Sequence, residues 1–68
     1  MNDEAFQHSI RKLLKTVGVN TQQQIEAAVN KARDEGTLAG NETLPATVTV
    51  RVEGIDLALD FAGDITLE

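Results

Sequence analysis

Two carboxylates in the second half of the chain, Asp56 and Asp60, come closest in type and spacing to a site for acid–base or metal chemistry. They stand four residues apart in a stretch that alternates as a β-strand does, which separates them by about 13 Å at ~3.3 Å per residue. That separation is too long for a shared metal ion or for the carboxylate pair of a retaining glycosidase. The spacing therefore predicts a solvated strand face.

The single histidine, His8, and its neighbour Ser9 are the other candidates for chemistry. Adjacent side chains diverge around a helix, so this pair cannot work as nucleophile and base. The chain has no cysteine and no second histidine to complete a zinc site. We therefore expect no catalytic residue, no cofactor, no metal site, and a protein that is not an enzyme.

The first half of the chain has the pattern of two amphipathic helices. A helix over 3–17 begins at a cap of Asn2 or Asp3 and ends at Gly18. A second helix over 22–35 begins at a capping box from Thr21 to Gln24 and ends at Gly36. Their apolar stripes each span about 100° and consist of Phe6, Ile10, Leu13, Leu14 and Val17 in the first and Ile25, Ala28, Val29 and Ala32 in the second.

The second half alternates between apolar and polar residues, as strands with one buried face do. Strands over 44–52 and 55–61 are joined at Glu53-Gly54, which pairs Val50 with Leu57 and sets Arg51 across from Asp56. A longer turn with a bulge remains open, and a third strand over 65–67 follows a loop at 62–64. The expected fold is α+β, with two helices packed on one face of a three-stranded antiparallel meander (ααβββ).

Length and charge limit the classes of function. The 68 residues make one small domain, 1–68, with a net charge of −5 that lies wholly after residue 40. No stretch has the ~20 apolar residues of a membrane span, and the acidic start is unlike a secretory signal, so we expect a cytoplasmic protein. Leu67-Glu68 matches a common purification-tag junction, which leaves the origin of these two residues open.

The segment 9–35 also resembles a helix-turn-helix that reads DNA, with a hairpin after it as a wing. Phosphate contacts would then come from Arg11, Lys12 and Lys15, the densest basic group. Against this reading, the second helix has no basic residue before Lys31 and the tip of the wing is Glu53. Nucleic-acid binding is therefore the alternative, and an ordinary helical hairpin is favoured.

Protein–protein interaction is the function that the pattern favours. In a meander, strand 44–52 is a long edge whose outward residues Thr47, Thr49 and Arg51 include no acid to discourage pairing. This edge is the candidate for pairing with an unidentified protein partner or with a second copy of the chain.

The stretches "SIRKLLKTVGVNTQQQIEAAV" (9–29) and "GNETLPA" (40–46) resemble a family of short uncharacterised bacterial proteins. The shared features are caps, turns and apolar stripes. The resemblance implies a small free-standing protein without an assigned activity, and no functional residue is carried over from it.

Overall fold

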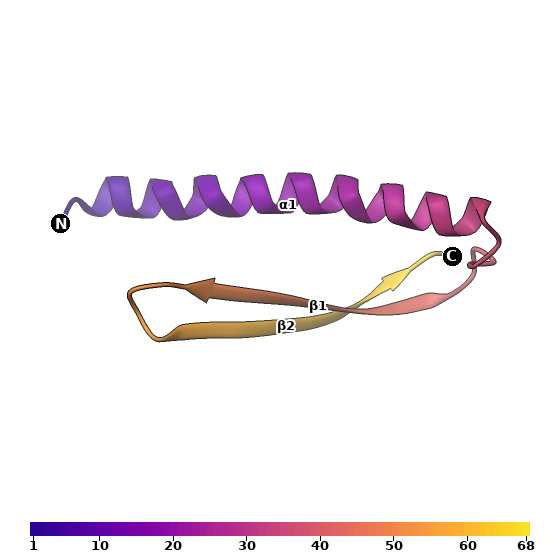
Figure 1. Cartoon of the computed structure of the whole chain (residues 1–68). Helices are drawn as coiled ribbons and strands as arrows, with labels where there is room; N and C mark the ends of the chain where they lie inside the picture. Colours follow the sequence, from indigo (N-terminus) through magenta and orange to yellow (C-terminus); the bar gives the residue numbers. More distant parts are fainter. The chain divides into compact units, whose positions relative to one another are not determined.

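The computed structural model describes all 68 residues and contains one helix and one two-stranded sheet (Figure 1). The helix α1 covers Asp3–Asp34, and the strands β1 and β2 cover Thr43–Val52 and Leu57–Thr66. The chain divides into two units, Met1–Thr37 and Leu38–Glu68. The α+β content is as expected, but the prediction of two helices on a three-stranded meander is wrong.

The two predicted helices, 3–17 and 22–35, are parts of the single helix α1. Gly18 does not break it, because its φ is not among the positive values that end a helix. Glycine inside a helix costs about 1 kcal/mol relative to alanine, which is a penalty rather than a stop. With no proline before residue 45, nothing removes a backbone donor from the helix. Thr21 is consequently an interior residue and not a cap.

Both ends of α1 are capped as the sequence indicates. At the start, Asn2 is the N-cap, and its side-chain oxygen accepts a hydrogen bond from the Ala5 amide at 3.1 Å. At the end, Gly36 has a φ of 81°. The Gly36 amide donates to the Arg33 carbonyl at 3.1 Å, and the Thr37 amide donates to the Ala32 carbonyl at 2.8 Å. This pair of bonds is a Schellman motif, so the prediction that Gly36 ends the helix is confirmed.

The strands form one antiparallel hairpin whose register differs from the predicted one by two residues. Val52 pairs with Leu57, and Val50 pairs with Leu59, leaving a four-residue loop at 53–56. The predicted two-residue turn at Glu53-Gly54 is therefore wrong, although Gly54 does supply a φ of 89°. Because the shift is an even number of residues, the apolar side chains that remain in the two strands still lie on the expected face of the sheet. Ile55, which was predicted to begin the second strand, lies in the loop.

The predicted third strand at 65–67 does not form: Ile65 and Thr66 are the last residues of β2, and Leu67 follows it. The strand runs through Gly63 without turning, and Ala46 pairs with Gly63 while Leu44 pairs with Ile65. Because the loop at 53–56 is longer than predicted, a straight β2 can form these pairs with β1. The second turn at 62–64 is then unnecessary, and the predicted meander is replaced by a ten-residue pairing.

Each unit has one apolar side that it does not cover. The hairpin gathers the large side chains of alternate positions on one face, where Phe61 is 58% exposed. Along α1 the apolar stripe is likewise open, and Leu13 is 62% exposed. No side chain in the chain is buried. A helix or hairpin with one apolar side needs a second apolar surface to exclude water from it.

Candidate functional site

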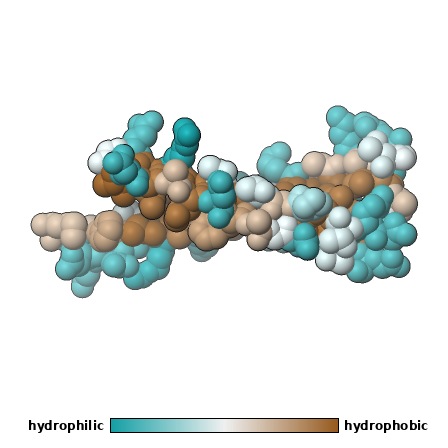
Figure 2. Space-filling model, turned by 90° about the horizontal axis from the view of Figure 1, so that it is seen from below, coloured by the Kyte–Doolittle hydropathy of each residue, from teal (hydrophilic) through white to brown (hydrophobic).

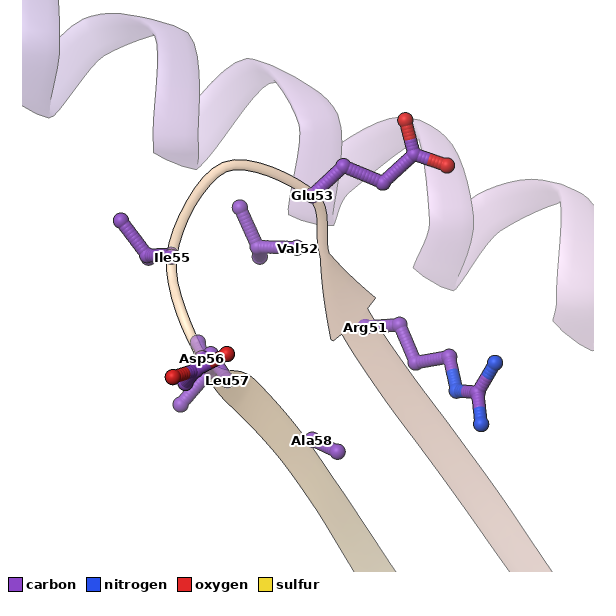
Figure 3. A pocket seen from close by; sticks show the side chains of 7 residues that line it. All are labelled: Arg51, Val52, Glu53, Ile55, Asp56, Leu57 and Ala58. Atoms are coloured by element: carbon purple, nitrogen blue, oxygen red, sulfur yellow. The ribbon is translucent and has the colours of Figure 1, made fainter.

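The turn of the hairpin surrounds an open hollow of about 460 Å³. Figure 3 shows Arg51 and Glu53 extending from the β1 side and Ile55 and Asp56 standing on the loop. All of its lining residues fall within 51–58, so the hollow is formed by the turn alone. The hollow presents one cation, two carboxylates and exposed apolar side chains. Such groups can contact the surface of another protein, but no hydrogen bond or ion pair holds any of them in position.

The carboxylates considered for chemistry do not form a site. Asp60 lies opposite Thr49, whose hydroxyl donates to the Asp60 carboxylate at 2.7 Å. Asp56 lies in the loop, and the predicted ion pair with Arg51 is absent because Arg51 pairs across the sheet with Ala58. No group of three or more potential ligands gathers anywhere in the structure.

Glu42 forms a polar cluster that the sequence analysis missed. Its carboxylate accepts three backbone N–H groups in succession, from Ala39 at 2.9 Å, Gly40 at 2.9 Å and Asn41 at 3.1 Å. These hydrogen bonds, led by the one from Ala39, lower the pKa of the Glu42 carboxyl below its ordinary value. The signal was present in "GNE", since Gly40 has a φ of 107° and permits the bent backbone that aims successive amides at one anion.

The predicted interaction edge, Thr47, Thr49 and Arg51, lies on the polar face of β1. Just beyond the strands, the Leu67 amide donates to the Glu42 carbonyl at 3.0 Å. Hydrogen-bonded pairs recur every second residue in an antiparallel ladder, so the even-numbered residues of β1 bond to β2. The amides of the three edge residues therefore face away from β2. Pro45 shares this parity, which explains why a proline is tolerated inside β1.

The residues of the nucleic-acid alternative lie on α1 without a turn between two helices. Arg11, Lys12 and Lys15 spread over about 100° of the helix surface, on the side away from the apolar stripe. His8 is exposed, and the Ser9 hydroxyl donates to the Phe6 carbonyl at 2.8 Å. The helix-turn-helix on which this alternative depended is absent, since α1 is continuous from Asp3 to Asp34.

The apolar stripe of α1 has a shallow hollow in its second half. A hollow of about 330 Å³ is lined by Asn20, Thr21, Gln24, Ile25 and Ala28. The large side chains of the stripe lie in the first half, where Leu13 and Leu14 are more than half exposed. The small side chains of the stripe predicted over 22–35 were the sequence signal for this hollow. The sequence did not indicate that this stripe continues the one over 3–17, because that follows only from the unbroken helix.

The apolar sides of α1 and of the hairpin, each taken by itself, are the most extensive functional candidates. Figure 2 shows brown, hydrophobic residues reaching the surface beside teal, hydrophilic ones. On the strands of the hairpin the exposed large apolar residues are Val48, Val52, Leu57, Leu59 and Phe61, and Ile55 is exposed in the loop. Nowhere along its length is α1 apolar enough to cross a membrane.

These features define a small α+β protein with a capped amphipathic helix and a hairpin that is apolar on one side. The chain belongs to a family of unknown function (DUF6494), whose model matches residues 1–68. The expected resemblance to an uncharacterised family is thereby confirmed. The chain matches no curated protein. It also matches no solved structure.

Proposed function

We propose that this chain is a non-enzymatic protein-interaction domain whose apolar surfaces act by association with protein. The observation that carries the proposal is that no side chain is buried while fourteen large hydrophobic residues are exposed. Burying apolar surface contributes about 25 cal/mol per Å². A chain of this length without disulfides or metal commonly gains stability by assembling.

The shape of the hairpin face supports a protein partner over a small ligand. Its apolar side chains follow a ten-residue pairing on which Phe61 and Val48 stand open, whereas small-molecule sites are concave and enclose most of the ligand. The outward amides of β1 add a row of donors that a partner strand can meet. Pairing of this edge with a second copy through strand 44–52 remains part of the proposal.

The charge supports the same reading. The unit Leu38–Glu68 carries six acidic groups and one basic group, giving it a net charge of −5. A surface of this sign repels phosphate backbones. We therefore place the partner among proteins. We also propose that this association takes place in the cytoplasm.

A pair of matched substitutions on β2 tests the proposal. Leu59→Asp places a charge on the apolar face, whereas Ala62→Asp places the same charge on the polar face. Loss of one leucine from an interface costs about 1.5–3 kcal/mol, so Leu59→Asp weakens association about tenfold or more. Sedimentation of the purified chain and capture of partners from cell lysate measure the effect.

The control separates a surface effect from a charge effect. Ala62→Asp is expected to leave both self-association and partner capture unchanged. A wild-type chain that remains monomeric at millimolar concentration and captures nothing that Leu59→Asp loses would exclude an interaction role for the hairpin face.

A further inference from the structure

We infer that α1 pairs side by side with α1 of a second copy in antiparallel orientation, centred on residue 19. The inference rests on the proposed function and names the partner for the helix. It concerns eight positions along the apolar side of α1, called here the α1 stripe: Phe6, Ile10, Leu13, Val17, Thr21, Ile25, Ala28 and Ala32. The apolar residues Leu14 and Val29 lie beside these positions and are not part of the α1 stripe.

The spacing of the α1 stripe is the same read in either direction. Its successive steps are 4, 3, 4, 4, 4, 3 and 4 residues, which is symmetric about residue 19. The midpoint of α1, between Asp3 and Asp34, falls at the same place. Two antiparallel copies therefore overlap along the whole helix, about 48 Å at 1.5 Å per residue. Phe6, Val17 and Ala28 recur every 11 residues, as do Ile10, Thr21 and Ala32. This spacing is close to the natural helical period, so the stripe stays on one side of a nearly straight helix.

Towards the ends of α1, the antiparallel alignment also matches large side chains to small ones. Each residue lies opposite the residue of the second copy whose number is 38 minus its own, so Phe6 faces Ala32 and Ile10 faces Ala28. Nearer the middle, Leu13 faces Ile25, which is also large. A parallel alignment would instead set Phe6 against its own copy at one end and Ala32 against its own copy at the other. Such helices would splay apart, whereas large-to-small pairing holds the axes at the even separation of about 8–10 Å that packed helices adopt.

The hollow on α1 lies where this alignment needs it. Four of its five lining residues, Thr21, Gln24, Ile25 and Ala28, are those that meet Val17, Leu14, Leu13 and Ile10 of the second copy. The fifth, Asn20, meets Gly18. The four side chains of the second copy are between 40% and 62% exposed. The first half of one helix thus supplies the ridge that fills the hollow in the second half of the other, and the two-fold axis makes the contact twice.

Disulfide trapping tests the orientation. The chain has no cysteine, so a single substitution introduces the only thiol. We expect a mixture of Leu13→Cys and Ile25→Cys chains, under mild oxidation, to give the mixed disulfide at least tenfold in excess of either disulfide between identical chains. In the proposed pair, the two Leu13 positions are about 18 Å apart along the axis, beyond the reach of a disulfide.

A second mixture provides the matched control. Lys15→Cys and Gln23→Cys also have numbers that sum to 38, but both lie on the polar side of α1, so no excess of mixed disulfide is expected. Preferential Leu13–Leu13 cross-linking would overturn the inference in favour of a parallel pair. Monomeric sedimentation without any disulfide would assign the α1 stripe to the chain's own hairpin. Either result leaves the comparison of Leu59→Asp with Ala62→Asp as a separate test of the proposed function.

Discussion

Glu42 is the residue whose surroundings are most specific in this chain. Three successive amides at the start of the hairpin unit converge on its carboxylate, which closes the loop before β1. The same cluster of donors would bind any anion of suitable size. Here the chain supplies the anion itself, so the cluster orders a loop and is not an open phosphate site.

The pH dependence of this loop follows from the lowered pKa of Glu42. A carboxyl group whose pKa is lower in the folded state contributes stability that is present above its unfolded pKa. That stability is lost as the pH falls through the folded pKa. The ordinary value is 4.5, so the contribution is complete at neutral pH and disappears only below that value. The amide resonances of Ala39 and Gly40, followed by NMR through an acid titration, should shift together with protonation.

The matched variant for this titration is Glu42→Gln. It retains one acceptor oxygen but removes the charge, so the acid-dependent shift of the Ala39 and Gly40 amides should be lost. An identical titration in Glu42→Gln would show that another group controls this loop.

At the scale of elements, the ends of α1 were predictable and its interior was not. Asn2 and Gly36 act through local backbone bonds, which the sequence specifies directly. Gly18 is a glycine like Gly36, and Thr21 belongs to the residue types that cap helices, as Asn2 does. In a continuous helix, however, the backbone hydrogen bonds on both sides of these residues outweigh their tendency to end it. A glycine signals a helix end only when the backbone there needs a positive φ.

The hairpin shows the same limit for strands. Alternation predicted which side chains share a face, and this part was correct because the register error was even. It could not predict the loop length, since two-residue and four-residue loops preserve the same faces. The predicted Arg51–Asp56 pair followed from the shorter loop and was wrong with it. The predicted third strand followed from a turn at 62–64 and was wrong because β2 runs straight through Gly63.

Alanine substitutions at two glycines test this account of α1. Nothing lies within 4 Å of a Cβ added at Gly18, and its backbone is helical. Gly18→Ala should therefore stabilise α1 by about 1 kcal/mol. Gly36→Ala should instead destabilise it, because a side chain is strained at a φ of 81°. Thermal unfolding followed by far-UV circular dichroism measures both. A loss of helicity in Gly18→Ala would indicate that the glycine is needed for a bend.

For the whole molecule, the decisive feature is the contrast between well-formed elements and the fact that neither unit by itself buries a side chain. The caps, the ladder and the loop around Glu42 satisfy backbone groups locally, but none of them removes apolar surface from water. Hydrophobic burial is the main favourable term in folding. A chain with this surface gains that term from another surface, and in the proposed pair the second copy supplies it for α1.

Thermal stability should therefore depend on protein concentration. Unfolding enthalpy is about 0.7 kcal/mol per residue, or roughly 95 kcal/mol for a pair of such chains. If unfolding is coupled to dissociation, mass action then raises Tm by about 5 °C for each tenfold increase in concentration. Calorimetry from ten micromolar to one millimolar covers two such steps. Leu59→Asp should lower Tm throughout this range, and Ala62→Asp should follow the wild-type line. A single Tm across the whole range would mean that the chain folds by itself, with its apolar surfaces covered within one copy.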